Sequence, residues 1–282
     1  MSKVVLVTDS TAYMPKELID RYKIRVAPQV LIWGNETFLD GVDILPDEFY
    51  RRLKTAKVMP SSGQVTPKTM IEIFGPILEG GDEVLGIFIG TKLSGTVASA
   101  DLAREQLGKE KIEVVDSTTT AMAMGFQILA AARAIEKGAN LSEAAEVARQ
   151  TISHTGVVFT LETLEFLQRG GRIGAATRFL GSALNLKPIL EVRGGQVEPI
   201  ERIRTKSKAL ERVLDIVEER IAGKTPVRLS TIHALAEEEA VQILNKAVAR
   251  FHPVENYMAI ASPVVGTHAG PGTVGLAFCA GV

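Results

Sequence analysis

Five short turns rich in hydroxyl groups or glycine are the part of this sequence best suited to chemistry. Each turn follows a short apolar run or stands where a helix should begin. Hydroxyl and backbone N–H groups at the carboxyl ends of parallel strands form a site for a small anionic head group, but they do not by themselves form a catalytic centre. The turns span residues 8–11 (TDST), 61–64 (SSGQ), 94–96 (SGT), 116–120 (DSTTT) and 266–272 (GTHAGPG).

Two serines are candidate contacts for such a head group, and each has a plain structural alternative. Ser62 stands beside Gly63 in a segment predicted to have no strand of its own, and a ligand can approach the backbone closely at a glycine. The alternative there is an ordinary serine turn. Ser94 lies between an apolar run and a predicted helix. It therefore faces the binding crevice or caps the helix, and the two roles are compatible.

Three longer side chains are also candidates for contact with an anion. His268 stands among threonine, glycine and proline, which predicts a loop rather than an apolar helix face, with a turn-stabilising hydrogen bond as the alternative. Arg172 and Arg204 lie in turn-rich segments, where a solvated surface arginine is the default. An arginine fixed near a crevice would instead bind a carboxylate or phosphate through two parallel hydrogen bonds. The segment Asp9-Ser10-Thr11 favours helix capping over ligand contact.

The elements that must position these residues alternate between strands and helices in the first half of the chain. Continuous apolar runs predict buried strands, and the segments between them have helical patterns. This alternation predicts a parallel sheet covered by helices on both faces. Gly34-Asn35 predicts a hairpin between residues 25–33 and 36–38. The other predicted strands span residues 3–7, 83–89 and 112–115, and the predicted helices span residues 15–22, 47–53, 68–78, 94–107 and 121–137.

The second half mixes a hairpin with strand–helix units. Residues 189–192 and 197–203 flank Arg193-Gly194-Gly195-Gln196, which indicates a hairpin and therefore a mixed sheet. We predict an α/β protein of two domains, residues 1–155 with a parallel sheet flanked by helices and residues 156–282 with a mixed sheet containing the hairpin. The remaining predicted strands span residues 156–161, 228–233, 257–262 and 274–279, and the predicted helices span residues 142–152, 163–168, 205–221 and 237–251.

Composition and missing motifs narrow the classes of function. The chain has 282 residues, 32 basic and 33 acidic, and the net charge of −1 gives no field that recruits nucleic acid. One cysteine, no signal-peptide pattern and no long apolar run indicate a cytoplasmic protein. Phosphate-loop, dinucleotide-binding and nucleophile-elbow motifs are missing, and the histidines have no metal-ligand spacing. The sequence therefore predicts no cofactor, no metal and no catalytic residue.

Taken together, the motifs resemble the DegV family of bacterial lipid-binding proteins, essentially from end to end. One departure stands where the family commonly has T-S-Q-P and this chain has Ser62-Gly63-Gln64-Val65, which removes one hydroxyl and loosens the turn. The matching segments are residues 7–12 (VTDSTA), 40–44 (DGVDI), 92–96 (KLSGT), 115–117 (VDS), 164–173 (LEFLQRGGRI), 185–190 (NLKPIL) and 268–272 (HAGPG).

The resemblance implies a long-chain fatty acid buried between or beneath the domains, with Ser62, Ser94 and His268 holding its carboxylate at the domain interface. It also implies an acyl-carrying subunit whose fatty acid is phosphorylated by a separate ATP-binding kinase, with Arg172 and Arg204 near the phosphate or the partner's docking surface, and it allows transient membrane contact. The alternative is a stand-alone enzyme that acts on a small anionic metabolite, because an anion site at strand ends would serve that too.

Overall fold

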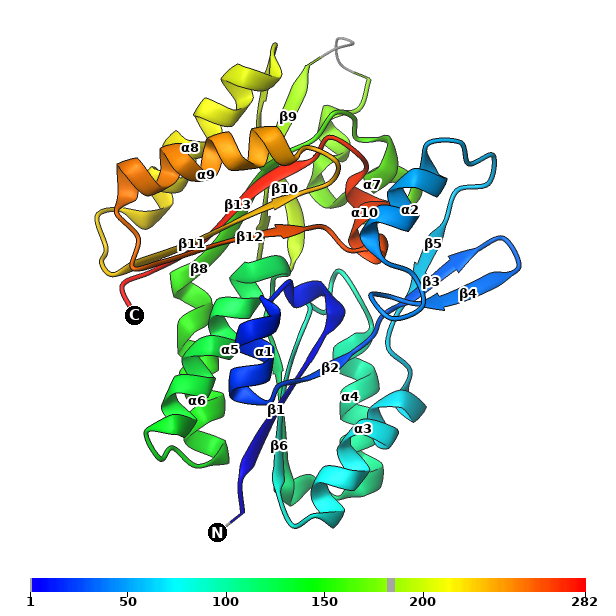
Figure 1. Ribbon diagram of the computed structural model, residues 1–282, viewed down its shortest axis with the longest axis vertical. Coiled ribbons are helices and arrows are strands. Elements are labelled where there is room, and N and C mark those ends of the chain that lie inside the picture. Colours follow the sequence, from blue (N-terminus) through cyan, green and yellow to red (C-terminus); the bar gives the residue numbers. More distant parts are fainter. Residues whose placement is uncertain (1, 182–185) are drawn as a thin grey trace.

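Two α/β units stack on one another in the protein (Figure 1). The computed structural model describes residues 2–181 and 186–282, so Asn185, the first residue of one matched motif, lies outside the described residues. Within the described residues, no helix is both long and apolar enough to cross a membrane. The described residues also form four short 3₁₀ helices, which are η1 (Ser10–Ala12), η2 (Lys109–Lys111), η3 (Ile152–His154) and η4 (Gly174–Phe179).

The first unit is built on a four-stranded sheet in which every pair is parallel, as predicted. Its order is β2-β1-β6-β7, with bounds Arg25–Ala27, Val4–Asp9, Glu83–Phe88 and Ile112–Asp116. Strand side chains alternate between the two faces, so each face buries its own cluster of apolar residues. One face packs against α3 (Pro67–Glu79) and α4 (Thr96–Leu107), and the other against α1 (Lys16–Tyr22), α5 (Ala121–Glu136) and α6 (Leu141–Thr151).

The second unit is built on a six-stranded mixed sheet, also as predicted. The hairpin joins β9 to β10, with Arg193 opposite Gln196, and β11 runs parallel to β12. Its order is β10-β9-β8-β13-β11-β12, with bounds Gln196–Ile203, Lys187–Arg193, Thr155–Thr160, Val274–Ala280, Val227–His233 and Glu255–Ile260. Helices α8 (Lys206–Ile221) and α9 (Glu237–Phe251) cover its outer face.

Helix α5 lies between the two sheets and belongs to the cores of both units. It is apolar around most of its circumference, which is the pattern of a helix buried on all sides. One apolar cluster joins Leu85 of the first sheet, Phe126 of α5 and Val157 of the second sheet. The boundary that we propose, between residues 155 and 156, therefore lies at the start of β8 and divides two units that share a core.

A small third sheet corrects two predictions about the first half. The run 25–33 is not one strand, because Pro28 removes a backbone donor and the chain changes sheets there, from β2 to β3 (Val30–Trp33). Hairpin β3–β4 (Val30–Trp33 and Glu36–Leu39) forms at Gly34-Asn35 as predicted, and α2 (Pro46–Leu53) follows. Residues Ser61–Gly63, expected to lack a strand, form β5 antiparallel to β3, with Ser62 opposite Leu31.

The segment around His268 corrects a third prediction. A glycine-rich loop was expected there, but Pro263–Ala269 form helix α10, with Ser262 at the N-cap position and His268 in the last turn. A serine followed by proline is a common start of a helix, because proline has no N–H to leave unpaired. Helix α10 packs beside α7 (Glu165–Arg169) and α2, where the two units meet (Figure 1).

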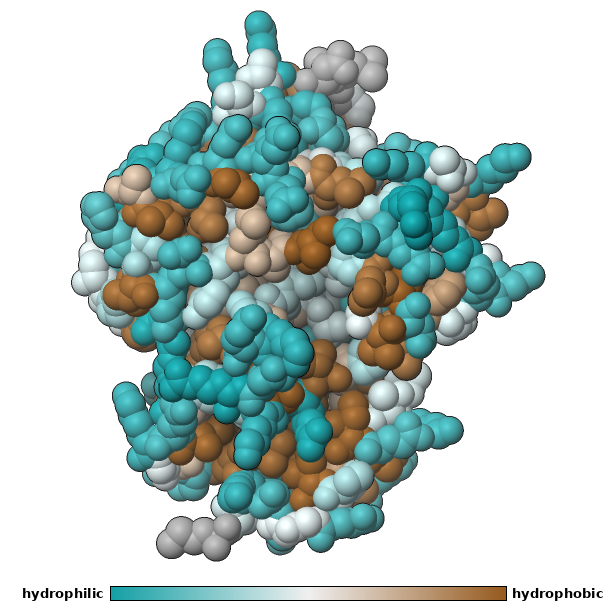
Figure 2. Space-filling view, in the orientation of Figure 1, coloured by the Kyte–Doolittle hydropathy of each residue, from teal (hydrophilic) through white to brown (hydrophobic). Residues whose placement is uncertain are grey.

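One edge of the parallel sheet remains uncovered. Strand β2 is the edge strand, and a groove lined by Ile24, Val26, Ile73 and Pro76 runs along it between α1 and α3. Figure 2 shows hydrophobic side chains gathered over this part of the lower unit. The groove is separate from the cavity described next, with which it shares no lining residue.

Candidate functional site

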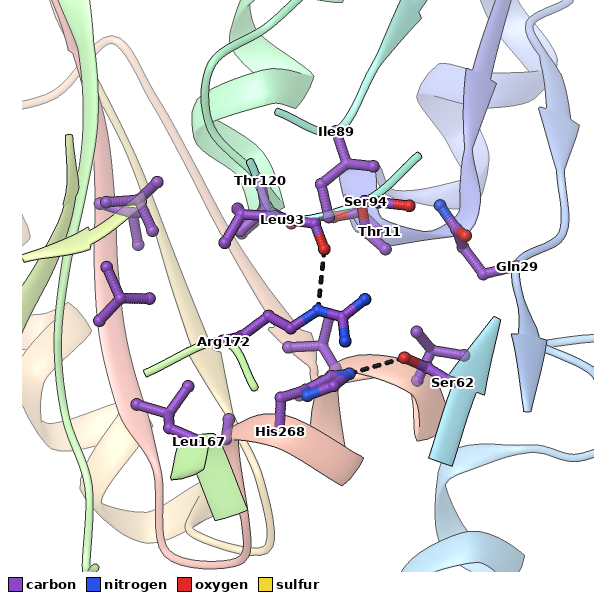
Figure 3. Close-up of a pocket in the computed structure, with 18 of the residues that line it drawn as sticks. Thr11, Gln29, Ser62, Ile89, Leu93, Ser94, Thr120, Leu167, Arg172 and His268 are labelled. Carbon is purple, nitrogen blue, oxygen red and sulfur yellow. Dashed lines mark hydrogen bonds between the residues drawn. The ribbon is translucent and has the colours of Figure 1, made fainter. Parts of the chain in front are cut away.

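A largely apolar cavity lies where the two units meet. Its unfilled space, including the solvent-open part at its mouth, is about 950 Å³. Polar side chains gather at one end of it (Figure 3). The apolar lining includes Ile89, Leu93, Val157, Phe159, Leu167, Val192, Val197 and Val264, and the polar lining includes Thr11, Gln29, Ser62, Ser94, Arg172 and His268.

Ser62 and His268 come from opposite ends of the sequence and meet at the polar end. The Ser62 hydroxyl and His268 Nε2 share a hydrogen bond of 2.7 Å (Figure 3). The ladder between β3 and β5 places the serine, and α10 places the histidine. Two segments 206 residues apart therefore form one polar pair across the boundary between the units.

The His268 imidazole is neutral at neutral pH. Burial, reinforced by the positive charge of Arg172, lowers its pKa to about 4. Gly170 packs directly on the ring, since a Cβ at residue 170 would lie only 1.9 Å from Nδ1. Nδ1 itself is buried without a hydrogen-bond partner among the described residues. Close packing on His268 therefore requires a glycine at position 170.

Two aspartates position the loop that carries Ser94. Asp9, at the end of β1, accepts hydrogen bonds from the backbone N–H of Ile89 (2.8 Å) and of Thr11 (2.9 Å). Asp116, at the end of β7, accepts a 3.3 Å bond from the Thr91 backbone N–H and a 2.7 Å bond from the Thr91 hydroxyl. The loop after β6 is thus fixed from both neighbouring strands. The aspartates of the matched D-S-T-A and V-D-S segments act through the backbone and do not line the cavity.

Ser94 lines the cavity and also bonds the first residue of α4, although the N-cap position of that helix is Gly95. Its hydroxyl lies 2.9 Å from Thr96 Oγ1 and accepts a 3.3 Å bond from the Thr96 N–H at the start of α4. The helix begins two residues later than predicted, and Ser94 remains in the cavity wall. Thr96 in turn accepts a 3.0 Å bond from Gln29 Nε2.

Gln29 is a buried cavity residue that sequence reasoning missed. It lies in the break between β2 and β3, and its amide reaches the Thr96 hydroxyl beside Ser94. The only local signal is Pro28, which interrupts an apolar run and so indicates a change of direction at this point. Thr11, for which the sequence favoured helix capping over ligand contact, also lines the cavity.

Arg172 is folded inward and does not lie on the open surface. Its Nε donates to the Leu93 carbonyl (3.0 Å) and its Nη1 to the Gly170 carbonyl (2.7 Å). Its guanidinium lies between the Ser94 loop and His268 (Figure 3). No acidic side chain pairs with it among the residues that the structure describes. An unpaired cation at the polar end suits an anionic ligand.

A second, more polar cavity adjoins the first. It shares Ser62, Arg172 and His268 with the first cavity and is also lined by Ser61 and Arg169. Its unfilled space is about 610 Å³, again counted out to its mouth. Ser62, Arg172 and His268 therefore stand between the two cavities, at the polar end of the apolar one.

Arg204 is apart from this cluster. It is exposed between β10 and α8 and lines neither cavity. Of the five residues singled out for the site, four come together in space and Arg204 does not. A role for Arg204 toward a partner stays a prediction.

The chemistry of the site suits an amphiphile. One end offers hydroxyl groups, a neutral imidazole and an unpaired guanidinium, and the rest of the cavity is lined by aliphatic and aromatic side chains. Apolar walls favour a hydrocarbon chain, and polar donors in a crevice of low dielectric constant satisfy a charged head group.

Comparisons with known proteins agree with one another. A family model described as an uncharacterised protein of the DegV family matches residues 3–281. Protein DegV of Bacillus subtilis is 32% identical over 280 residues, which is 98% of this chain and 99% of that protein. A DegV domain-containing protein of Streptomyces coelicolor is 34% identical over 275 residues, 97% of each chain.

Solved structures extend the similarity to the fold. A fatty-acid-binding DegV family protein from Thermus thermophilus superposes with a TM-score of 0.93 at 32% identity, over 99% of both chains. DegV of Bacillus subtilis, described as a fatty acid binding protein, superposes with a TM-score of 0.90 at 31% identity, over 99% of this chain and 100% of the other.

Proposed function

The chain belongs to the DegV family, and on that premise we propose that it is a carrier of long-chain fatty acids that presents its ligand to a separate ATP-dependent kinase. The observation that carries the proposal is the apolar cavity that ends at the Ser62–His268 pair. The fatty-acid-binding relatives of known structure support the same ligand class.

The acyl chain provides most of the binding energy in this proposal. Each buried CH₂ group contributes roughly 0.8 kcal/mol, so a chain of about sixteen carbons gains several times more than one hydrogen bond provides. The apolar lining also disfavours the alternative of a small polar metabolite, which would leave these walls in contact with water.

The head group is held by hydroxyl donors in the proposed complex. With His268 neutral, Nε2–H can donate to Ser62 Oγ, and the Ser62 hydroxyl hydrogen is then free for the carboxylate. Ser94 provides the second hydroxyl, since the Thr96 hydroxyl can donate to the Gln29 amide oxygen 3.3 Å away. The Arg172 guanidinium adds charge complementarity.

The second cavity supports the kinase part of the proposal. A phosphoryl group delivered to the carboxylate would emerge through the wall formed by Ser62, Arg172 and His268. Arg172 would then face the transferred phosphate, and the exposed Arg204 would face the partner. The chain itself contributes no catalytic residue in this scheme, and the role places it in the cytoplasm, with transient membrane contact to exchange fatty acid.

Titration of the delipidated protein with matched ligands tests the proposal. Hexadecanoate should bind tightly, 1-hexadecanol should bind more weakly because it has no carboxylate, and butanoate should not bind measurably. Equal affinity for hexadecanoate and butanoate would contradict the carrier role. Adding a DegV-partner kinase with ATP and assaying acyl phosphate then tests presentation separately from binding.

A further inference from the structure

Asp40, from the matched segment 40–44, has no part in the site as described so far. Its carboxylate is 2% exposed and follows the hairpin strand β4. Oδ2 accepts a 2.6 Å bond from the Ser10 hydroxyl, and Oδ1 accepts a 3.1 Å bond from the backbone N–H of Val264. The two oxygens of one buried carboxylate therefore join the first unit to helix α10.

Helix α10 belongs to the second half of the sequence, yet first-half residues hold its N-terminal end. The Tyr50 hydroxyl donates to the Ala261 carbonyl (3.1 Å), and the Tyr13 and Ser262 hydroxyls lie 3.2 Å apart. Gly266 packs so closely here that a Cβ would lie 2.6 Å from the Tyr50 hydroxyl oxygen. The side chain of the N-cap residue commonly accepts a hydrogen bond from an N–H in the first turn of a helix, but Ser262 makes no such bond. Asp40 accepts from the Val264 N–H instead.

The bonds of Asp40 connect the two sides of the head-group site. On one side, Ser10 Oγ accepts a 3.1 Å bond from the Gln29 N–H, and the Gln29 side chain reaches Thr96 beside Ser94. On the other side, Val264 lies one helical turn before His268, which bonds Ser62. One connected path therefore runs through Ser94, Thr96, Gln29, Ser10, Asp40, Val264, His268 and Ser62.

We propose that Asp40 is a positioning residue that fixes helix α10, and hence His268, in register with the Ser94 side of the head-group site. The identity of the ligand rests on the proposed function, but the positioning itself does not. Asp40 touches neither cavity. Its effect on binding must therefore pass through α10 and through Ser10.

Three variants separate positioning from general stability. Asp40→Leu keeps the approximate shape and removes both acceptors. Asp40→Asn keeps an acceptor for the Val264 N–H, and its amide can donate to Ser10. Asp43→Leu is the matched control, because Asp43 lies in the same loop, is exposed, and accepts only from the Leu39 N–H (2.7 Å) within the described residues.

The experiment measures two quantities on each delipidated variant, hexadecanoate affinity and the pKa of the His268 imidazole by NMR. With Asp40→Leu we expect affinity to fall roughly tenfold or more. We also expect the His268 pKa to rise from about 4 toward its ordinary value of about 6.5 as the ring loses its buried position. Asp40→Asn should restore both quantities largely, and Asp43→Leu should change neither.

An unchanged His268 pKa and unchanged affinity in folded Asp40→Leu protein would overturn the proposal, as would Asp40→Asn behaving like Asp40→Leu. If Asp40→Leu does not fold, Ser10→Ala replaces it, and a His268 pKa identical to that of the parent protein then contradicts the coupling. If no variant and no parent protein binds hexadecanoate, the proposed ligand is wrong, while the His268 pKa still decides the role of Asp40.

Discussion

At the scale of single residues, the hydroxyl and aspartate motifs have different tasks. Asp9 and Asp116 hold the backbone of the Ser94 loop, whereas the side chains of Ser62 and Ser94 line the cavity. Spacing along the chain cannot separate these tasks, because all four are small polar residues in segments with similar patterns. Only burial and hydrogen-bond partners distinguish them.

Ser94→Ala should weaken fatty-acid binding and leave the fold intact. The lost hydrogen bond to a charged carboxylate is worth roughly 1.5–3 kcal/mol, so affinity should fall by about one to two orders of magnitude. The thermal midpoint should fall only slightly, since the bond from the Thr96 N–H is long at 3.3 Å. Displacement of a fluorescent fatty acid measures affinity, and exposed Ser153→Ala is the control. Equal affinities for the two variants would remove Ser94 from the site.

Arg172→Ala should affect phosphoryl transfer more than binding. The guanidinium supports the Leu93 carbonyl, so fatty-acid affinity should fall a few-fold. Transfer should fall roughly a hundredfold if the same group stabilises charge on the transferred phosphate. Arg172→Lys keeps the positive charge but loses the pair of parallel N–H donors. Its rate of phosphoryl transfer should therefore lie between the rates of the parent protein and of Arg172→Ala. Fatty-acid dissociation and acyl-phosphate formation are measured on the same preparations, and an equal loss in both would make Arg172 a ligand-binding residue only.

His268 should make the free energy of unfolding fall as the pH is lowered through the mildly acidic range. Its folded-state pKa, about 4, lies below the value of about 6.5 expected when unfolded. As pH falls, the unfolded state binds the proton first, so this contribution is complete above about pH 6.5 and is lost toward pH 4. The loss is on the order of 3 kcal/mol. Thermal midpoints across this range should fall more steeply for the parent protein than for His268→Asn, and parallel curves would show that the imidazole is not buried neutral.

At the scale of elements, three neighbouring strands form the floor of the cavity away from His268. Val157, Val192 and Val197 stand opposite one another on β8, β9 and β10, and all three line the cavity. Thr155, the next residue of β8 on this face, bonds Gln127 and lies outside the lining. The other end of β8 leads to α7, which packs on α10. The valine row therefore marks where the methyl end of a bound chain would stop.

Val157→Met should shift the preferred ligand to shorter chains. A longer side chain at the floor takes the space of about two methylene groups, which removes roughly 1.6 kcal/mol from acids that need that space. Val158→Met is the matched control, because Val158 faces α8 on the other side of the same strand. Competition among saturated acids of graded length measures the preference. The same optimum in both variants would show that the floor lies elsewhere.

The sequence predicted the long strands and helices well, and it predicted the short elements around the site poorly. Apolar runs and helical periodicity predicted both sheets, because burial of strands and helices depends on local patterns. Strand β5 has only two serines and a glycine, and its existence depends on pairing with β3. Helix α10 and the inward turn of Gln29 likewise depend on contacts with distant segments. The sequence therefore predicted most of the residue types of the head-group site but not their geometry.

At the scale of the whole molecule, a shared core joins the two units beside the site that lies between them. Helix α5 packs on both sheets, and its N-terminal residue Ala121 lines the cavity. The bond from the Val264 N–H to the Asp40 carboxylate and the bond from the Tyr50 hydroxyl to the Ala261 carbonyl add a second connection across the same boundary. The cavity walls thus come from both units, while the relative position of the units is fixed on two sides.

Native mass spectrometry of the protein, purified from cells without added lipid, tests the central claim most directly. The carrier role predicts a population whose extra mass equals one long-chain fatty acid per chain and which loses that mass under denaturing conditions. A variant that combines Ser62→Ala with Ser94→Ala should retain less ligand. Bare protein in every preparation that also fails to take up added hexadecanoate, or a bound mass that belongs to a small polar metabolite, would contradict the account.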